Sequence, residues 1–330
     1  MASHYSVPSG NGPVDPEYRK FINENYDKIL AQTKKSATCF GFEESTTPYA
    51  SVAPEDREAV FQTLWDKGNG FRFMFGGFSD IASNTEANDA ACAFVRKKIA
   101  EKVRDPEKAR KLTPSEPYAR RPLCDHGYYE QFNRDNVDVV DLRDEPIETI
   151  TETGIRTTAR HYDLDIIIFA TGFDAVDGSF NRVNIRGSKG QSLKEPWAKA
   201  DTPKSFLGVI VSGFPNMFMI LGPQGPFVNN PSAIEEQSEL NVKLILHTEE
   251  ERLKRGKAVI DTTPEAEDAW VDICNASAEA TLFPQTGSWI FGNNTKGKKV
   301  ASRFFLTGMA AYLGYVNDMI SHGYKGYRIE

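Results

Sequence analysis

Two neighbouring arginines are the residues of this sequence best suited to hold negative charge. Arg120 and Arg121 stand directly before Pro122. A guanidinium stays protonated at any working pH and offers several donors, so the pair suits a phosphate or an oxyanion that develops during a reaction. By themselves, the two residues are explained more simply by a solvated ion pair at the surface.

Two further segments follow apolar runs with small or rigid residues. Phe169–Asp174 and Gly222–Pro226 both contain glycine, which lets backbone approach a ligand at the carboxyl edge of a sheet. We expect Ser232 to cap the helix after the second segment, and the positive N-terminus of that helix suits an anionic ligand. An ordinary turn is the simpler interpretation of the first segment. A purely structural loop remains an alternative for the second.

Several catalytic and nucleotide-binding motifs are absent. Gly292–Lys299 has the glycine and lysine spacing of a phosphate-binding loop, but Lys299 stands where that loop needs serine or threonine. We expect a basic turn there. The sequence contains no G-x-G-x-x-G and no G-x-S-x-G, which removes the simplest dinucleotide-binding and hydrolase interpretations.

Cysteine and histidine give no sign of a metal site. They are widely scattered and show no C-x-x-C, H-x-x-x-H or H-E-x-x-H spacing. We expect the cysteines to be buried thiols that pack as small apolar groups. The residues concerned are Cys39, Cys92, Cys124 and Cys274, with His4, His126, His161, His247 and His322.

Composition narrows the class of protein. The 330 residues carry a net charge of −7, with 40% hydrophobic and 26% charged residues. An acidic chain without a lysine and arginine stripe is not expected to bind nucleic acid. Its apolar runs fall far short of the roughly 20 residues of a membrane-spanning helix, and its first residues show no secretory signal. We therefore expect a cytoplasmic protein of about two domains that does not enter a membrane.

Apolar periodicity predicts a mostly helical first third and sheet layers after it. Helices are predicted over 16–35, 54–67, 85–103, 232–255, 264–282 and 307–322, and Gly68 is expected to end the second of them. Strands are predicted over 137–142, 147–150, 155–158, 164–170, 206–211 and 217–221. The second and third strands should form a hairpin, and the run 164–170 should be buried on both faces.

Taken together, these segments resemble the C-terminal part of Baeyer–Villiger monooxygenases, the flavoproteins typified by cyclohexanone monooxygenase. The resemblance extends over essentially the whole chain. Its motifs are specific as a set, although each is weak alone. The matching residues are Val7–Asn11, Ala119–Asp125, Tyr128-Tyr129, Asn133–Val137, Phe169–Asp177, Gly213–Asn216, Gly222–Glu235 and Ser288-Trp289.

The resemblance implies FAD and NADPH as cofactors, no metal, and NADPH- and O2-dependent conversion of a ketone to an ester or lactone. Arg121 matches an arginine that stabilises negative charge at the flavin during oxygen transfer, and Arg120 matches a basic residue near the NADPH 2′-phosphate. Trp289 matches a tryptophan on the nicotinamide side, and Asp174 falls in the connector between the nucleotide domains. The stretch packed around the flavin ring matches Gly222, Pro223, Asn230 and Ser232.

Other family features are missing from the sequence. These are both glycine-rich fingerprints and the F-x-G-x-x-x-H-x-x-x-W-P signature, and Asn293–Lys298 departs from the family's proline-containing turn. The resemblance therefore implies an N-terminally incomplete monooxygenase, either truncated or one piece of a split enzyme. A sheet without its first strands favours self-association or pairing with a complementing N-terminal chain. Without the glycines that meet the pyrophosphate, this chain alone is not expected to bind either nucleotide.

The expected fold is α/β, with the C-terminal portions of two Rossmann-like nucleotide-binding domains and a helical insertion region. The implied divisions are a linker remnant of the NADPH domain over 1–17, the helical region over 18–126, the second half of the NADPH-type domain with the connector over 127–178, and the second half of the FAD-type domain over 179–330. One alternative is a FAD-independent pseudoenzyme that uses the remaining cleft to bind or convert a small ligand. An inactive decay product that barely folds is another.

Overall fold

The protein divides into two compact units. The computed structural model describes residues 3–5, 13–200, 202–295 and 297–330. Ser45–Gly172 and the N-terminal strand form the first unit, and Gly12–Glu44 with Phe173–Glu330 form the second. The Val7–Asn11 motif and most of the linker expected over 1–17 lie outside the described residues. The domain divisions expected from the sequence stay predictions.

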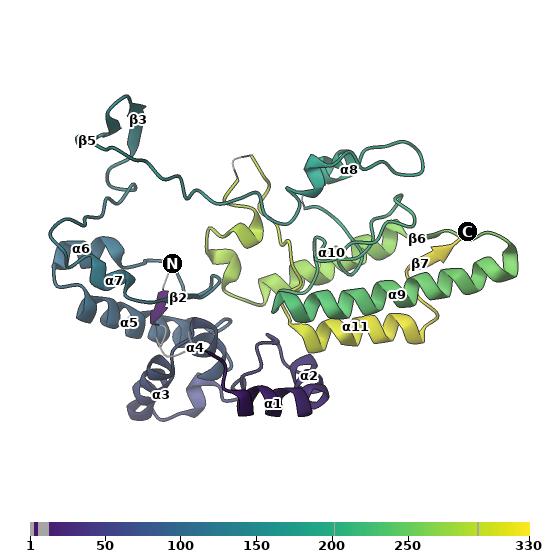
Figure 1. Ribbon diagram of the computed structural model, residues 1–330, viewed down its shortest axis with the longest axis horizontal. Helices are drawn as coiled ribbons and strands as arrows, with labels where there is room; N and C mark the ends of the chain where they lie inside the picture. The colour runs from purple at the N-terminus through teal and green to yellow at the C-terminus, as the bar shows by residue number, and fades with distance from the viewer. Residues whose placement is uncertain (1–2, 6–12, 201, 296) are drawn as a thin grey trace. The chain divides into compact units, whose positions relative to one another are not determined.

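Helices build most of the first unit (Figure 1). They are η2 (Tyr49–Ser51), α3 (Pro54–Lys67), α4 (Gly70–Gly76), α5 (Thr85–Lys102), α6 (Pro106–Leu112) and α7 (Tyr128–Gln131). Helix α3 ends where Gly68 adopts a positive φ of 70°, which confirms the predicted stop. Helix α5 begins after Asn84, whose side chain accepts hydrogen bonds from two backbone N–H groups of the first turn.

An aromatic cluster forms the core between these helices. Phe61 lies with its ring centroid 5.5 Å from that of Phe73, 5.2 Å from that of Phe78 and 5.6 Å from that of Phe94. All four rings are buried. Fully burying a side chain of this size stabilises a fold by about 1.5–3 kcal/mol. The inward face predicted for α5 is confirmed, because Ala87, Ala91, Phe94, Val95 and Ile99 are all buried.

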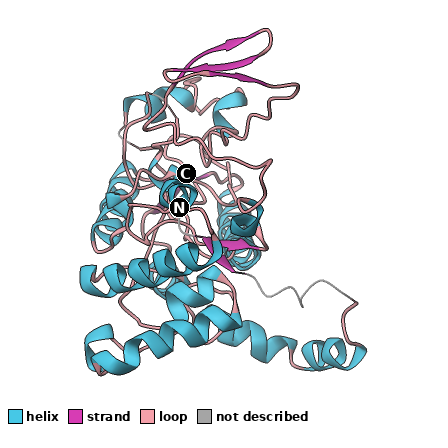
Figure 2. Ribbon diagram, turned by 90° about the vertical axis from the view of Figure 1, so that its left-hand side faces the viewer, coloured by secondary structure: helices cyan, strands magenta, loops and turns pink. Residues whose placement is uncertain are grey.

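Strands are few in the first unit. Figure 2 shows them as a small hairpin sheet and a separate short pair. The sheet is antiparallel and joins β3 (Ile147–Thr151), β4 (Gly154–Thr157) and β5 (His161–Asp163), which confirms the predicted hairpin. In the other pair, β1 (Ser3–Tyr5) runs parallel to β2 (Leu123–Asp125), the strand that follows the two arginines.

The strand predicted over 137–142 is wrong. The segment is irregular and ends in a turn. Two lysines from α6 bind its backbone: Lys108 Nζ donates to the Val137 carbonyl at 2.6 Å and Lys111 Nζ to the Val139 carbonyl at 3.5 Å. These side-chain donors satisfy carbonyl groups that a strand would present to a neighbouring strand.

The strand predicted over 164–170 is also wrong. The segment is not part of any sheet, and Ile166, Ile168 and Phe169 are 77%, 85% and 67% exposed. After Leu164, which donates its N–H to the Thr153 carbonyl at 2.9 Å, no described strand pairs with it. A β-strand forms only when its backbone hydrogen-bonds to a neighbouring strand. An apolar segment without a neighbouring strand therefore stays extended and exposed.

Helices also dominate the second unit. They are α1 (Pro16–Glu24), α2 (Tyr26–Lys34), η3 (Phe180–Arg182), α8 (Lys194–Lys199), α9 (Asn230–Arg255), α10 (Pro264–Glu279), η4 (Phe283–Gln285), η5 (Trp289–Phe291) and α11 (Met309–Ser321). The four long helices predicted here are confirmed, but the first is divided at Asn25. The Asn25 side chain donates to the Phe21 carbonyl at 2.9 Å, a local bond that competes with continuous helix.

The core of the second unit lies between α9, α10 and α11, of which α9 and α11 run side by side in Figure 1. Leu240 and Leu244 from α9, Trp270 from α10 and Tyr312 from α11 are all buried there. The C-terminal strand β7 (Tyr327–Ile329) pairs antiparallel with β6 (Ile260–Thr262) and closes this unit.

The strands predicted over 206–211 and 217–221 are wrong. The expected burial is confirmed for most of 206–211, whereas in 217–221 only Met219 is buried and Ile220 is 44% exposed. Val209 and Ile210 are fully buried, but the chain turns back on itself so that Phe206 and Ile210 face each other as an isolated pair. Leu207 and Gly208 in this turn have positive φ values of 55° and 75°. The apolar side chains of Leu207, Val209 and Ile210 are therefore buried by a compact turn and not by a sheet.

The expectation for the cysteines is confirmed for three of the four. Cys39, Cys92 and Cys274 are buried, whereas Cys124 is exposed. No helix within the described residues is long and apolar enough to cross a bilayer. The molecule is a mixed α/β protein, which confirms the expected fold class.

Candidate cofactor and catalytic site

The two arginines differ in their surroundings. Arg120 pairs with Glu116, with 2.5 Å between Nη2 and Oε2, and its buried Nε meets no acceptor among the described residues. Arg121 is exposed. Its guanidinium carbon lies 5.2 Å from the Phe71 ring centroid, and Nη1 donates to the Pro122 carbonyl at 3.3 Å. The expected ion pair is confirmed for Arg120, although its side chain is only 21% exposed. Arg121 has no carboxylate partner among the described residues and keeps donors that face solvent.

Buried hydrogen bonds hold the chain that carries these arginines. Tyr118 is buried, and its hydroxyl donates to the Gly70 carbonyl at 3.1 Å. The buried Asn88 side chain accepts from Tyr118 N–H at 2.9 Å and donates to the Tyr118 carbonyl at 3.1 Å. Because this asparagine satisfies both backbone groups of Tyr118, the main chain two residues before Arg120 is fixed to α5.

The segment that starts at Gly222 is buried and tightly folded. Gly222 N–H donates to the Gly208 carbonyl at 3.1 Å, and a Cβ atom at position 222 would lie only 2.5 Å from that oxygen. Glycine is therefore required here by a close approach between two turns of the same chain. The carbonyl of the buried Pro223 accepts a hydrogen bond from the Ser205 hydroxyl.

Ser232 does not cap the helix after this segment, which corrects the expectation. Helix α9 begins at Asn230, two residues earlier, so Ser232 lies within its first turn. Asn229 occupies the cap position, but its side chain donates to the Cys39 carbonyl at 3.1 Å and caps nothing. No side chain therefore satisfies the first turn of α9 within the described residues. The exposed Asn230 and half-buried Ser232 stand at this positive helix end.

Trp289 packs against the same loop. It opens η5 after Ser288, whose hydroxyl accepts a hydrogen bond from the Ile290 N–H at 3.3 Å. The Trp289 ring centroid lies 6.1 Å from that of Phe227 and 5.6 Å from that of Phe304. The structure thus brings Trp289 together with the loop between Gly222 and Asn230.

Asp174 takes part in an ion cluster that joins two distant parts of the chain. Lys298 Nζ pairs with Asp174 and, at 2.8 Å, with Asp177 Oδ2. Asp177 Oδ1 in turn lies 3.3 Å from Nη1 of Arg303, and both of these side chains are buried. The Arg303 carbonyl accepts from Gln224 N–H at 2.8 Å, which connects the cluster to the loop after Gly222.

The predicted site residues therefore fall into two groups. Arg120 and Arg121 belong to the first unit. The second unit holds the other six, and within it the loop packs against Trp289 and connects to Asp174 through Arg303. Within the described residues, the basic turn predicted over 292–299 is confirmed for 292–295 and 297. The sequence analysis did not foresee that Lys298 pairs with Asp174 and Asp177.

No family model matches this chain. Curated sequence relatives do match nearly all of it, as two examples show. Cyclohexanone 1,2-monooxygenase from Acinetobacter sp. is 47% identical over 330 residues, which are 100% of this chain and 60% of that protein. A Baeyer-Villiger monooxygenase from Pseudooceanicola batsensis is 46% identical over 324 residues, which are 98% of this chain and 58% of that protein.

The chain is a homologue of the Baeyer–Villiger monooxygenases. It spans about 60% of the length of the curated relatives it matches. The resemblance that the motifs indicated is thereby confirmed.

Solved structures of Baeyer–Villiger monooxygenase relatives agree with the fold. Cyclohexanone monooxygenase from Rhodococcus sp. Phi1 bound to NADP+ superposes with a TM-score of 0.92 at 46% identity, covering 100% of this chain and 61% of that one. A complex of OTEMO with FAD and NADP gives a TM-score of 0.89 at 31% identity, with the same coverage of the two chains. The mixed α/β structure therefore matches part of the cyclohexanone monooxygenase fold.

The residues present fit these nucleotides in part. Arg121 has donors that face solvent, and the first turn of α9 lacks a side-chain cap, so both can receive a negatively charged group. Trp289 is only half-buried and offers ring surface beside the loop. The described residues contain no group of three or more His, Cys, Asp or Glu arranged to hold a metal ion.

Proposed function

We propose that this chain supplies part of a Baeyer–Villiger-type flavin monooxygenase, which converts a ketone to an ester or lactone with NADPH and O2. The supporting observation is 47% identity over all 330 residues to a cyclohexanone 1,2-monooxygenase. In this proposal the chain contributes the C-terminal portions of two Rossmann-like nucleotide-binding domains and a helical insertion region.

In this proposal, Arg121 is the catalytic residue. When bound, FAD and NADPH supply the reducing electrons and the site at which O2 is activated. Arg121 is exposed and makes one hydrogen bond among the described residues, to the Pro122 carbonyl, so its other donors can meet negative charge that develops beside it. Phe71 stacks below the guanidinium and limits its orientation.

The remaining candidate residues would hold the cofactors. Arg120 would pair with a phosphate, and its current partner Glu116 is the carboxylate that such a group would displace. Gly222 and Pro223 would fix the backbone conformation of the loop. Asn230 and Ser232 would place a negatively charged group at the positive N-terminal end of α9. Trp289 would line the nicotinamide side, and Asp174 would fix the connector through Lys298.

The experiment is complementation. The chain is co-expressed with the N-terminal 40% of the Acinetobacter relative, supplied with NADPH and O2, and assayed for ε-caprolactone from cyclohexanone; the length follows from the 60% match. We expect Arg121→Ala to lower lactone formation by about 100-fold or more, because one preorganised donor is worth that much. NADPH-driven bleaching of the flavin absorbance should continue in this variant.

A matched control keeps this test specific. Arg104 is also exposed and lies in the same unit, so Arg104→Ala should leave lactone formation unchanged. Arg121→Lys tests whether charge alone is sufficient or whether the planar donor set is needed. Full lactone formation by Arg121→Ala would remove the residue from the catalytic role, and a complex that bleaches flavin without oxidising any ketone would overturn the oxygenase assignment.

A further inference from the structure

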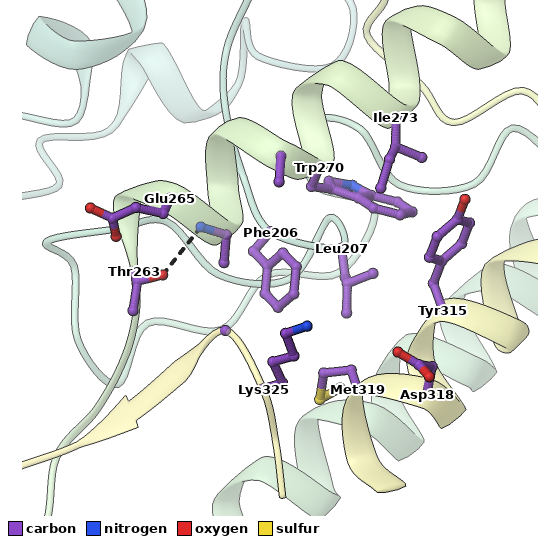
Figure 3. A pocket seen from close by; sticks show the side chains of 13 residues that line it. Phe206, Leu207, Thr263, Glu265, Trp270, Ile273, Tyr315, Asp318, Met319 and Lys325 are labelled. Carbon is purple, nitrogen blue, oxygen red and sulfur yellow. Dashed lines mark hydrogen bonds between the residues drawn. The ribbon is translucent and has the colours of Figure 1, made fainter. Parts of the chain in front are cut away.

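A cavity of about 420 Å3 opens in the second unit, and none of the residues that line it is among those assigned to oxygenation. It lies between the start of α10, the C-terminal half of α11, the turn before β7 and the turn at 206–207 (Figure 3). Its size is within the usual range for small-molecule sites. Its apolar walls are formed by Phe206, Leu207, Trp270, Ile273 and Met319.

The indole of Trp270 is the rigid part of this wall. Its side chain is 1% exposed, and its Nε1–H is already bonded to the Gln224 carbonyl at 3.1 Å. The Tyr315 ring stands against it, with 5.3 Å between centroids at 75°. The ring therefore offers the cavity an apolar surface that needs no further hydrogen bond, which suits an aliphatic or aromatic group.

Lys325 is the lysine that lines this cavity beside its apolar walls. In Figure 3 the Lys325 side chain extends between Leu207 and Met319, with its ammonium group directed toward the cavity. The Lys325 backbone is fixed by a hydrogen bond from its N–H to the Met319 carbonyl at 3.2 Å. No described carboxylate lies within ion-pair distance of its Nζ. The ammonium is thus a positive charge at the cavity that is open to a partner.

The lining also carries two exposed carboxylates, Glu265 and Asp318. Asp318 Oδ1 lies 3.3 Å from His322 Nδ1 on the next turn of α11. Glu265 lies at the far end of the cavity in Figure 3, beyond Thr263, with its carboxylate directed away from Trp270. A negatively charged ligand group is favoured near Lys325, and the apolar remainder would cover Trp270 and Leu207.

We propose that this cavity binds a small organic acid, an apolar ring or short chain that bears one carboxylate. The carboxylate pairs with Lys325, and the hydrocarbon part packs on Trp270, Leu207 and Ile273. The proposal is independent of the oxygenase function, because all of these residues lie outside the loop, the arginine pair and the ion cluster.

Three probes of similar size and different charge test the proposal on the full chain. Cyclohexanecarboxylate, cyclohexylmethanol and cyclohexylmethylamine are each titrated with ligand-observed NMR. We expect the carboxylate to bind about tenfold more tightly than the alcohol, and the amine to bind most weakly. Lys325→Gln should remove this preference by weakening the carboxylate about tenfold while leaving the alcohol unchanged.

Two further variants complete the test. Lys257→Gln is the control, because Lys257 is also exposed in the same unit but lies outside the cavity. Ala269 lines the cavity at an exposed position, so Ala269→Phe should fill the space and abolish binding of both acid and alcohol without unfolding the chain. Tightest binding by the amine, an unchanged acid affinity in Lys325→Gln, or no saturable binding of the acid would each overturn the proposal.

Discussion

The side-chain oxygen of Gln237 accepts a hydrogen bond from the Leu221 N–H at 2.7 Å, and its Nε2 donates to the Leu207 carbonyl at 3.4 Å. Both leucines have positive φ values, 54° and 55°, in which residues with a Cβ are strained. One fully buried amide on α9 therefore holds two strained turns, and the turn at Leu221 lies directly before the loop that we propose holds flavin.

Replacing this amide should destabilise the loop. We expect Gln237→Leu to lower the free energy of unfolding by about 1–3 kcal/mol, because it leaves the Leu221 N–H without its acceptor. It also removes one of two donors to the Leu207 carbonyl, which keeps the hydrogen bond from the Tyr312 hydroxyl at 2.8 Å. Urea titration measures the loss, and hydrogen exchange should quicken within 206–225. Ser238→Ala, at the next position on the exposed face of α9, is the control. Equal exchange in the two variants would contradict this role for Gln237.

Glu267 makes the stability of the second unit depend on pH. Burial raises the pKa of this carboxyl from 4.5 to about 7, although it accepts a hydrogen bond from the Ser212 N–H at 3.1 Å. The folded state thus favours the protonated form. The stabilisation is complete below the unfolded pKa near 4.5 and is lost as the pH rises through about 7.

Glu267→Gln should remove this dependence. The shift corresponds to about 3 kcal/mol between low and high pH, so the variant should be more stable than the parent by up to about that amount above pH 8. Urea unfolding at several pH values measures the difference. The control is Glu265→Gln, at an exposed position of the same helical turn, which should leave the pH dependence of the unfolding free energy unaltered. Parallel profiles for parent and Glu267→Gln would contradict the prediction.

The ion cluster should tolerate loss of Asp174 better than loss of Asp177. Asp177 is 6% exposed and lies between Lys298 and the buried Arg303, so Asp177→Asn leaves two cations without their shared carboxylate. We expect a loss of about 3–5 kcal/mol. Asp174 is 30% exposed, and Asp174→Asn leaves Lys298 paired with Asp177, so the loss should stay below about 1 kcal/mol. Unfolding midpoints of the two isosteric variants decide between these outcomes.

The exposed isoleucines should promote self-association. Ile166 and Ile168 are 77% and 85% exposed in an extended segment that no described strand covers. The double substitution Ile166→Lys and Ile168→Lys should lower the apparent mass in light scattering at high protein concentration without lowering the melting temperature. Adding the same charges at the exposed Thr149 and Thr158 should leave the mass unchanged. A strictly monomeric parent would refute the expectation.

The helices could be predicted because their signals are local. The apolar face of α5, the proline that begins α3 and the glycine that ends it all act within a few residues of the chain. A helix satisfies its backbone internally, so its sequence carries nearly all the information needed. The match to the Baeyer–Villiger monooxygenases was likewise indicated by short motifs before any fold was known.

The strands and the connections of the site were decided by tertiary structure. The run 164–170 has the composition of a buried strand, yet strand formation depends on a neighbour that its sequence cannot specify. Lys298 meets Asp174 across more than a hundred residues, and Gln237 holds turns on a distant segment. Such contacts depend on how helices pack in space, which periodicity along the chain does not encode. Sequence therefore determined the long helices and the resemblance to the Baeyer–Villiger monooxygenases, and packing determined which segments pair as strands and which side chains meet.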